Sequence, residues 1–163
     1  MLRLRSTWWL PAPAERVWEV LERVEDWPRW WPGMDAATVV REGGTATVGE
    51  RVHLVVRSPI GYRLRFGVEI VAAEPPRRAA ARVVGDLVGT GEWLVEPAAA
   101  GCAATIRWHV VPVRPAMRTA LRVLAWPLVW AHGRVMQRGE TALRALLERG
   151  DDHRADVTPT PAR

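Results

Sequence analysis

The sequence predicts an α+β domain in which a seven-stranded antiparallel sheet is covered by a long C-terminal helix. First, residues 2–10 alternate apolar and polar side chains with the period of two that is typical of a strand. Second, six strand-like segments follow between residues 38 and 111, separated by short turns that contain glycine or proline. Third, residues 128–148 lack proline and repeat apolar side chains at three- and four-residue steps, as an amphipathic helix does.

The first strand places four side chains on one face: Leu4, Ser6, Trp8 and Leu10. Pro11 and Pro13 end this strand, and Pro13 suits the opening turn of a short helix over residues 14–24. The apolar stripe of that helix is Val17, Trp18, Leu21 and Val24. Pro28 predicts a second brief helical turn, which Pro32 and Gly33 stop. Trp27, Trp30 and Trp31 are therefore expected on a compact helical corner.

The next six strands are predicted from alternation between turn residues. They cover residues 38–42, 51–57, 62–74, 77–86, 90–96 and 104–111. Short connections between neighbours indicate an antiparallel meander. Within them, apolar side chains such as Leu64 and Phe66 alternate with Arg63 and Arg65. One face of the sheet should therefore be covered and the other should face water.

The C-terminal helix is expected to cover the apolar face of the sheet. Its buried stripe is predicted to contain Leu128, His132, Val135, Met136, Gly139, Leu143 and Leu146. Pro127 should kink this helix or divide it in two. A helix of ~20 residues spans about 30 Å, enough to cross seven strands. Residues 150–163 are expected to form a flexible tail, so that residues 1–149 make up a single domain.

Composition narrows the functional classes. The net charge is +5, but all 23 basic residues are arginines, and they are spread along the chain instead of forming a cluster. We therefore expect no nucleic-acid partner. Cys102 is the only cysteine, which excludes an intramolecular disulfide. The longest apolar stretch, residues 121–131, contains Arg122 and is shorter than the ~20 residues of a membrane span. A cytoplasmic protein without stable membrane insertion is expected.

Known cofactor motifs are missing from the sequence. The four histidines are scattered and show neither HxH nor HExxH spacing, so no metal site is predicted. The glycine-rich segments precede strands or turns and not a helix, which argues against a phosphate-binding loop. We therefore expect no cofactor.

Four segments carry a resemblance to a known family: residues 10–34, 85–97, 106–113 and 130–143. Together with the order of elements, they resemble the START-like (SRPBCC) superfamily, and in particular its bacterial polyketide cyclase/dehydrase-like branch. The resemblance extends over residues 2–149. It implies a helix-grip fold, in which a curved seven-stranded sheet surrounds the long C-terminal helix and two short helices follow the first strand. It also implies a cavity between the sheet and that helix.

The aromatic residues are the first candidates for contact with a ligand. Trp27, Trp30 and Trp31 would lie beside the cavity mouth, where they either contact a ligand or plug the end of the sheet. Four other residues are predicted to line the cavity: Tyr62, Trp93, Trp108 and Met136. A packed core explains these four equally well.

His132 is the one histidine whose helical position points inward, so it is the only candidate catalytic residue. It would hydrogen-bond a ligand or act as a general acid or base, or else be a core histidine bonded to a backbone carbonyl. His53 and His109 should face solvent. Asp86 either caps a turn at the end of its strand or points into the pocket, and the turn is favoured.

Two functions fit these predictions. The preferred one is a carrier or binding protein for a hydrophobic or aromatic molecule that is lipid-like, a polyketide or an isoprenoid. The alternative is a polyketide cyclase or dehydratase that uses His132. Binding is preferred because no paired acid and base can be assembled from the sequence. A third possibility is an interaction module that uses the tryptophan corner. The protein is expected to be a monomer or a homodimer.

Overall fold

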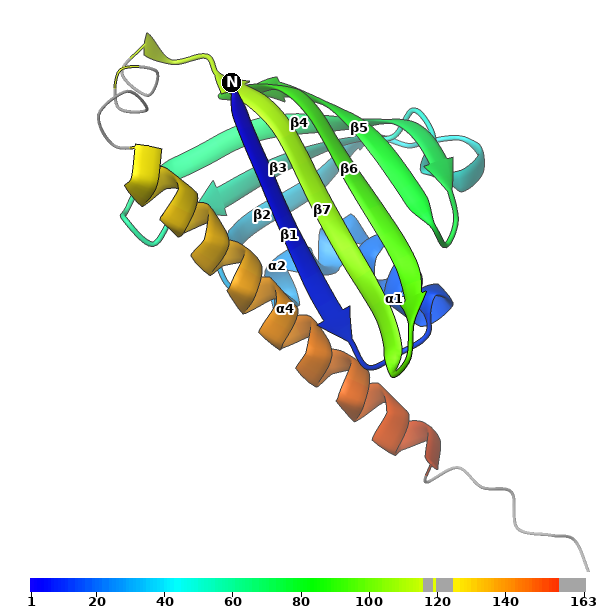
Figure 1. The fold of residues 1–163 in the computed structure, drawn as a ribbon. Helices are drawn as coiled ribbons and strands as arrows, with labels where there is room; N and C mark the ends of the chain where they lie inside the picture. Colours follow the sequence, from blue (N-terminus) through cyan, green and yellow to red (C-terminus); the bar gives the residue numbers. More distant parts are fainter. Residues whose placement is uncertain (116–118, 120–124, 156–163) are drawn as a thin grey trace, which may run out of the picture.

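A computed structural model describes residues 1–115, 119 and 125–155 of the chain, and shows an α+β helix-grip fold (Figure 1). The strands are β1 (Leu2–Leu10), β2 (Met34–Arg41), β3 (Arg51–Arg57), β4 (Arg63–Glu74), β5 (Arg78–Gly85), β6 (Leu87–Ala98) and β7 (Gly101–Pro112). The helices are α1 (Ala14–Leu21), α2 (Trp27–Trp30) and α4 (Ala125–Ala155), with 3-10 turns at Val24–Asp26 and Thr45–Thr47.

All seven strands form one antiparallel sheet in the order β1-β7-β6-β5-β4-β3-β2. Strands β2 to β7 are connected as successive antiparallel hairpins. The last strand, β7, also pairs with the first strand, β1. Figure 1 shows the sheet curving so that α1 and α2 lie on its inner side, with α4 running along β1. Helix α4 packs against β1 and α2, so it closes the side that the curved sheet leaves open.

The predicted strands are confirmed, and the largest differences are at three strand starts: β2 begins four residues before its predicted start, and β6 and β7 each begin three residues before theirs. Strand β2 begins at Met34, four residues before the predicted start, and two register shifts interrupt its pairing with β3. Those irregularities break the alternation that sequence reasoning relies on. Strand β6 begins at Leu87 and contains Gly89 and Gly91. Glycine weakens the pattern of a strand, so this first part was not predicted.

The corner after β1 forms as expected, with two short helices. Val17 and Leu21 of α1 are buried, and Pro13 precedes its first turn. After α2, Gly33 adopts φ +100°, a left-handed conformation that only glycine adopts without strain. This residue lets the chain reverse directly from the tryptophan corner into β2.

Helix α4 presents a stripe to the interior that is close to the predicted one. Its buried residues are Ala131, Val135, Met136, Gly139, Leu143 and Leu147. Leu128, His132 and Leu146 lie half-buried at the margin of this stripe. Pro127 lies near the described start of α4, and the residues before it, where the kink or division was expected, are largely outside the described part. The helix extends to Ala155, beyond the expected domain end at residue 149.

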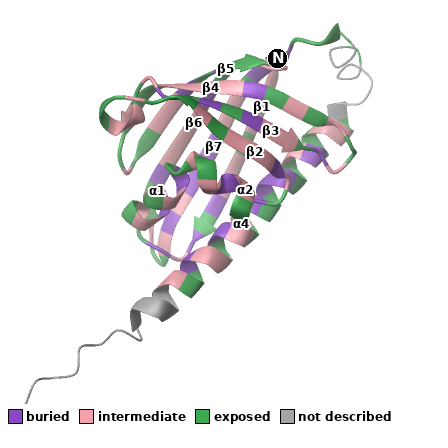
Figure 2. Ribbon diagram, turned by 180° about the vertical axis from the view of Figure 1, so that it is seen from behind, coloured by how far each residue is buried: buried purple, intermediate pink, exposed green. Residues whose placement is uncertain are grey.

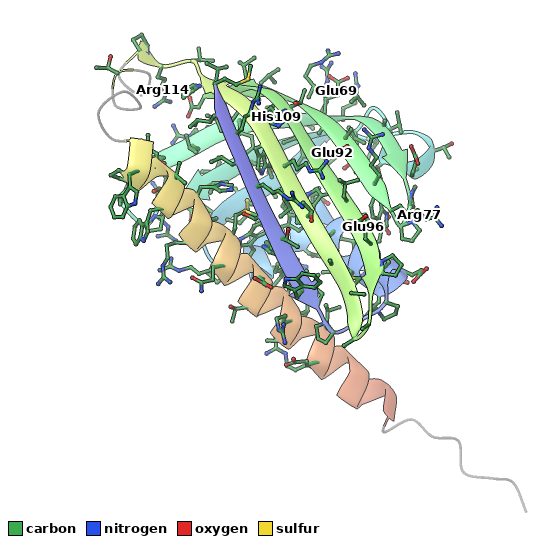
Figure 3. All side chains as sticks on the ribbon, in the orientation of Figure 1. Glu69, Arg77, Glu92, Glu96, His109 and Arg114 are labelled. Carbon is green, nitrogen blue, oxygen red and sulfur yellow. The ribbon has the colours of Figure 1, made fainter. Side chains whose placement is uncertain are left out.

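Residues coloured as buried gather on the inner face of the sheet and on the facing side of α4 (Figure 2). The outer face faces water and carries ion pairs between strands, and Figure 3 labels two of its acidic residues, Glu69 and Glu92. Glu69 binds Arg41 and Arg51, and Glu92 binds Arg78 and Arg107. The predicted division into one covered face and one wet face is therefore confirmed.

Candidate functional site

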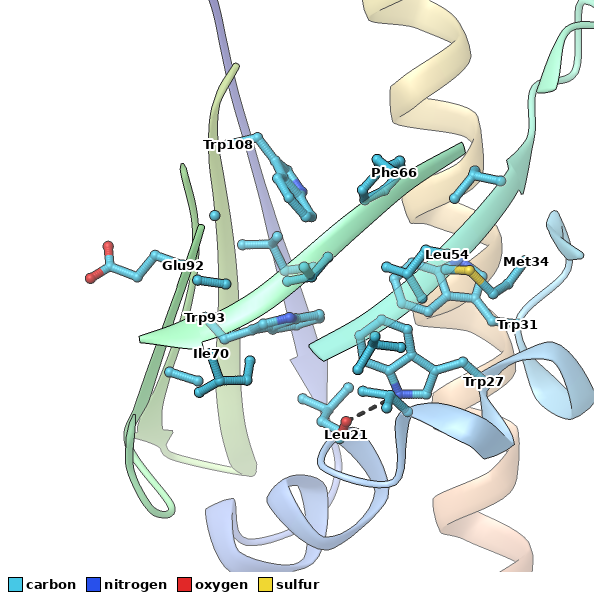
Figure 4. Close-up of a pocket in the computed structure, with 18 of the residues that line it drawn as sticks. Leu21, Trp27, Trp31, Met34, Leu54, Phe66, Ile70, Glu92, Trp93 and Trp108 are labelled. Atoms are coloured by element: carbon cyan, nitrogen blue, oxygen red, sulfur yellow. Dashed lines mark hydrogen bonds between the residues drawn. The ribbon is translucent and has the colours of Figure 1, made fainter. Parts of the chain in front are cut away.

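A cavity of about 180 Å³ lies between the inner face of the sheet, the α1–α2 corner and α4 (Figure 4). Strands β3 and β4 contribute period-two rows of apolar side chains: Val52, Leu54 and Val56, and Leu64, Phe66, Val68 and Ile70. The indoles that line the cavity are Trp18, Trp27, Trp31, Trp93 and Trp108. Val135, Met136 and His132 reach it from α4.

The wall of this cavity is almost entirely apolar. The polar residues that line it are Glu22, Thr47, Glu50, Glu92 and His132, apart from the indole N–H groups. Figure 4 shows the carboxylate of Glu92 pointing away from the cavity, consistent with its ion pairs on the outer face. No arginine is among the described residues of the wall. An apolar molecule therefore meets few polar groups inside.

A second, smaller cavity of about 100 Å³ adjoins the first. The two share seven lining residues: Leu4, Val56, Leu64, Leu87, Val110, His132 and Val135. Tyr62 lines this second cavity and not the first. Burial raises the pKa of the Tyr62 hydroxyl, so the group stays protonated at neutral pH. Because His132 is one of the shared residues, it borders both cavities.

The tryptophan corner is held by hydrogen bonds to backbone carbonyls. The Nε1–H of Trp27 donates to the carbonyl of Leu21 at 3.1 Å, and that of Trp31 donates to the carbonyl of Val135 at 3.0 Å. Trp8 packs edge-on against Trp31 and Trp93, with ring centroids 5.0 and 5.3 Å apart. These contacts fix the rings that form one end of the cavity, and they are typical of a rigid apolar wall.

Trp30 differs from its two neighbours. Its ring stacks on Trp31 at a centroid distance of 5.5 Å, but it does not line either cavity. It is half-buried, whereas Trp27 and Trp31 are buried. The corner therefore brings Trp27 and Trp31 to the cavity and leaves Trp30 behind them as support.

His132 is placed where its helical phase predicted, at the cavity wall. Its Nε2 atom is buried and has no hydrogen-bond partner among the described residues. Burial lowers the pKa of the imidazole from 6.5 to about 4, so the ring is neutral at pH 7. The backbone carbonyl partner that a purely structural histidine would have is not found at this nitrogen. Nε2 is therefore free for a hydrogen bond to a bound molecule.

Glu50 lines the cavity and was not predicted. It is only 8% exposed, and no hydrogen bond or ion pair reaches its carboxylate from the described residues. Its pKa is raised, first by burial and then by repulsion from Glu42, Glu25 and Glu22. The clue in the sequence was the inward row of β3: two residues before Val52 is Glu50, just outside the predicted strand.

The remaining candidates lie away from the cavity. His53 and His109 are exposed on the outer face, as expected. Asp86 accepts a 2.9 Å hydrogen bond from the backbone N–H of Arg65 and forms a 2.9 Å ion pair with Arg114. The favoured interpretation of Asp86, a residue that stabilises the connection between strands, agrees with these contacts.

Similarity to other proteins extends over nearly the whole domain. Residues 1–148 match the family described as polyketide cyclase / dehydrase and lipid transport. No curated protein sequence matches the chain significantly. Among solved structures, TTHA0849 from Thermus thermophilus has a TM-score of 0.70 at 20% identity, covering 89% of this chain and 99% of its own.

Two aromatase/cyclases share the same fold. The Zhui aromatase/cyclase from Streptomyces sp. R1128 has a TM-score of 0.69 at 20% identity, with 91% of this chain and 94% of its own covered. The di-domain BexL from the BE-7585A biosynthetic pathway has a TM-score of 0.67 at 17% identity, with 88% of this chain and 49% of its own covered.

Neither a membrane-spanning helix nor a cluster of metal-ligating side chains is found among the described residues. None of their helices combines the length and the apolar character needed to cross a bilayer. No group of three or more histidine, cysteine, aspartate or glutamate side chains in residues 1–115, 119 and 125–155 is arranged to hold a metal ion.

Proposed function

Because this chain belongs to the polyketide cyclase / dehydrase and lipid transport family, we propose that it binds one hydrophobic aromatic molecule in the cavity beneath α4, as a carrier or binding protein. The family description includes both transport and catalysis. The observation that carries the proposal is the apolar cavity itself, whose walls contain five indoles and no arginine among the described residues. Such a pocket favours apolar ligands that bury most of their surface.

The size of the cavity supports a compact ligand. An engineered apolar cavity of about 150 Å³ is known to bind benzene, so a space of about 180 Å³ suits a molecule of one or two rings. Hydrogen bonds and ring contacts already hold Trp27 and Trp31, which lowers the entropic cost of ordering the wall on binding. Longer ligands would extend past His132 into the adjoining space.

Calorimetric titration with 1-naphthalenemethanol, a neutral two-ring probe, tests this proposal. We expect saturable binding at one site, with quenching of tryptophan emission. Ala81 is buried and lines the cavity, so Ala81→Leu should fill part of it and weaken binding at least tenfold. Ala80, the preceding residue, points to the other face of β5, so Ala80→Leu is the matched control. Absent saturation in the wild type, or equal effects of the two variants, would contradict the proposal.

Catalysis as a cyclase or dehydratase is the second candidate, and His132 is the observation that favours it. Its unpartnered Nε2 borders both cavities and is available to accept a proton. A pKa of about 4, however, makes the imidazole a weak base, whereas efficient general bases have a pKa near the working pH. Binding is therefore preferred to catalysis.

A further inference from the structure

Glu50 occupies a position that should hold an apolar side chain. Side chains of β3 alternate, and the inward row runs through Val52, Leu54 and Val56, all of which line the cavity. Glu50 precedes this row by two residues and lines the same cavity. Its backbone carbonyl accepts a 3.0 Å hydrogen bond from the N–H of Ile70, whose side chain also lines the cavity. The fold therefore holds Glu50 at the cavity wall, at the end of the inward row of β3.

No cation neutralises this carboxylate among the described residues. The other partly buried acidic residues of the sheet are paired with arginines: Asp35 with Arg57 and Arg63, Glu69 with Arg41 and Arg51, Asp86 with Arg114, and Glu92 with Arg78 and Arg107. Glu50 is more buried than these and has neither an ion pair nor a side-chain hydrogen bond within the described part of the chain. The carboxylate oxygens keep some contact with water, because neither of them is a fully buried atom without a partner. No positive group lies beside them within the described part of the chain, and a ligand can provide one.

The surroundings of Glu50 favour a cation and disfavour an anion. Glu22 also lines the cavity, and Glu25 and Glu42 are close enough to Glu50 for their charges to repel its own. His132 is the only potentially basic side chain among the described lining residues, and it is neutral at pH 7. The indole faces of the same cavity add attraction for a cation. This negative site lies in a chain whose net charge is +5.

We infer that the cavity accepts a hydrophobic amine, with the protonated amine beside Glu50 and the apolar body among the indoles. This inference rests on the proposed function, because it names the chemical class of the ligand bound in the same cavity. A protonated amine supplies the missing charge partner of Glu50. A carboxylate ligand of the same size would be repelled by Glu50 and Glu22.

Three probes of matched shape test the inference: 1-naphthylmethylamine, 1-naphthalenemethanol and 1-naphthoate. Their dissociation constants are measured by calorimetry at pH 7.5. We expect the amine to bind at least about 10-fold more tightly than the alcohol, because a charge-assisted hydrogen bond is stronger than a neutral one. The carboxylate should bind weakest. In Glu50→Gln, the affinity for the amine should fall to that for the alcohol, while the affinity for the alcohol stays within about 3-fold.

Glu92→Gln provides the matched control. Glu92 is a lining residue, but its carboxylate points away from the cavity and binds Arg78 and Arg107 on the outer face (Figure 4). This variant should therefore keep the preference for the amine. If the alcohol binds as tightly as the amine, or if Glu50→Gln keeps the preference, the inference is wrong and the proposed function stands. If none of the three probes binds, the proposed function fails and the inference fails with it.

Discussion

The indole N–H of Trp31 donates a 3.0 Å hydrogen bond to the backbone carbonyl of Val135, joining the corner after β1 to the C-terminal helix. Gly139, one turn further along α4, lies directly against the same ring. A Cβ at Gly139 would come within 2.5 Å of Nε1 and Cε2 of Trp31 and within 2.9 Å of Trp8. The close approach of α4 to the two indoles therefore requires a residue without a side chain at position 139.

Gly139→Ala should destabilise the fold, although alanine favours helix more than glycine does. The clash involves rigid buried rings that cannot rotate away, and overpacking of this kind typically costs about 1–3 kcal/mol or more. Gly133 on the same helix is the control, because a Cβ there meets nothing within 4 Å. Gly133→Ala should stabilise by about 0.5–1 kcal/mol. Urea unfolding measures both, and equal effects would show that α4 does not approach the indoles this closely.

The variant Met136→Ala tests whether Met136 lines the cavity or lies in the packed core. Met136 is 5% exposed and lines the cavity, so part of its surface already lacks packing partners. We expect a loss near the lower end of the ~2–5 kcal/mol range for such truncations, together with a changed affinity for the naphthalene probe. Leu143 is fully buried and lines neither cavity, so Leu143→Ala should cost more and leave affinity unchanged. Similar losses without any change in affinity would place Met136 in a packed core.

The fold was predictable because the sheet and the long helix carry regular patterns. The alternation around Phe66 and the helical stripe through Val135 and Leu143 correspond to the observed buried faces. Prediction was weaker where local geometry departs from the pattern. Strand β2 starts early at Met34 across a register shift, and Leu147 is buried more deeply than the predicted Leu146. A small error in helical phase accumulates over a helix of 31 residues.

The candidate site was only partly predictable. Trp93, Trp108 and His132 line the cavity, and their inward positions could be predicted from strand alternation or helical phase. Trp27, which was expected on the helical corner, also lines it. Sequence patterns could not show that Trp30 stacks behind Trp31, since that depends on the rotation of a four-residue helix. Glu50 was missed because a carboxylate next to a turn is normally solvated, and only the tertiary fold buries it.

Glu50→Gln should raise the stability of the protein at neutral pH. Because its pKa is raised in the folded state, the folded protein binds more protons than the unfolded chain above the ordinary pKa of 4.5. The carboxyl group therefore destabilises the fold progressively as the pH rises through its raised pKa. Glutamine is neutral at all pH values and avoids this loss.

Thermal unfolding between pH 4 and pH 8 checks the prediction for Glu50. The melting temperature of Glu50→Gln should exceed that of the wild type at pH 8 and approach it at pH 4. Glu92→Gln, which loses an outer-face carboxylate with arginine partners, should show no such gain at pH 8. Wild-type stability equal to that of Glu50→Gln across the whole range would contradict the unpaired state of this carboxylate.

The stability contributed by His132 should have the opposite pH dependence. Its pKa is lowered from 6.5 to about 4, so between these values the unfolded chain binds a proton that the folded protein excludes. The wild type therefore loses up to about 3 kcal/mol as the pH falls through this window, relative to a variant without the imidazole. Unfolding of the wild type and of His132→Gln at pH 7, 5.5 and 4 measures this difference, which should grow as the pH falls.

The same variant decides whether His132 takes part in catalysis. Glutamine keeps a hydrogen-bonding group near the free Nε2 position but cannot accept a proton near neutral pH. In a carrier, His132→Gln should change ligand affinity by no more than the ~0.5–1.5 kcal/mol of one hydrogen bond. In an enzyme that uses the ring as acid or base, turnover should fall ~100-fold or more while affinity stays nearly constant. If both affinity and turnover are unchanged, His132 has neither role, because a residue that bonds or protonates the ligand cannot be replaced without affecting one of them.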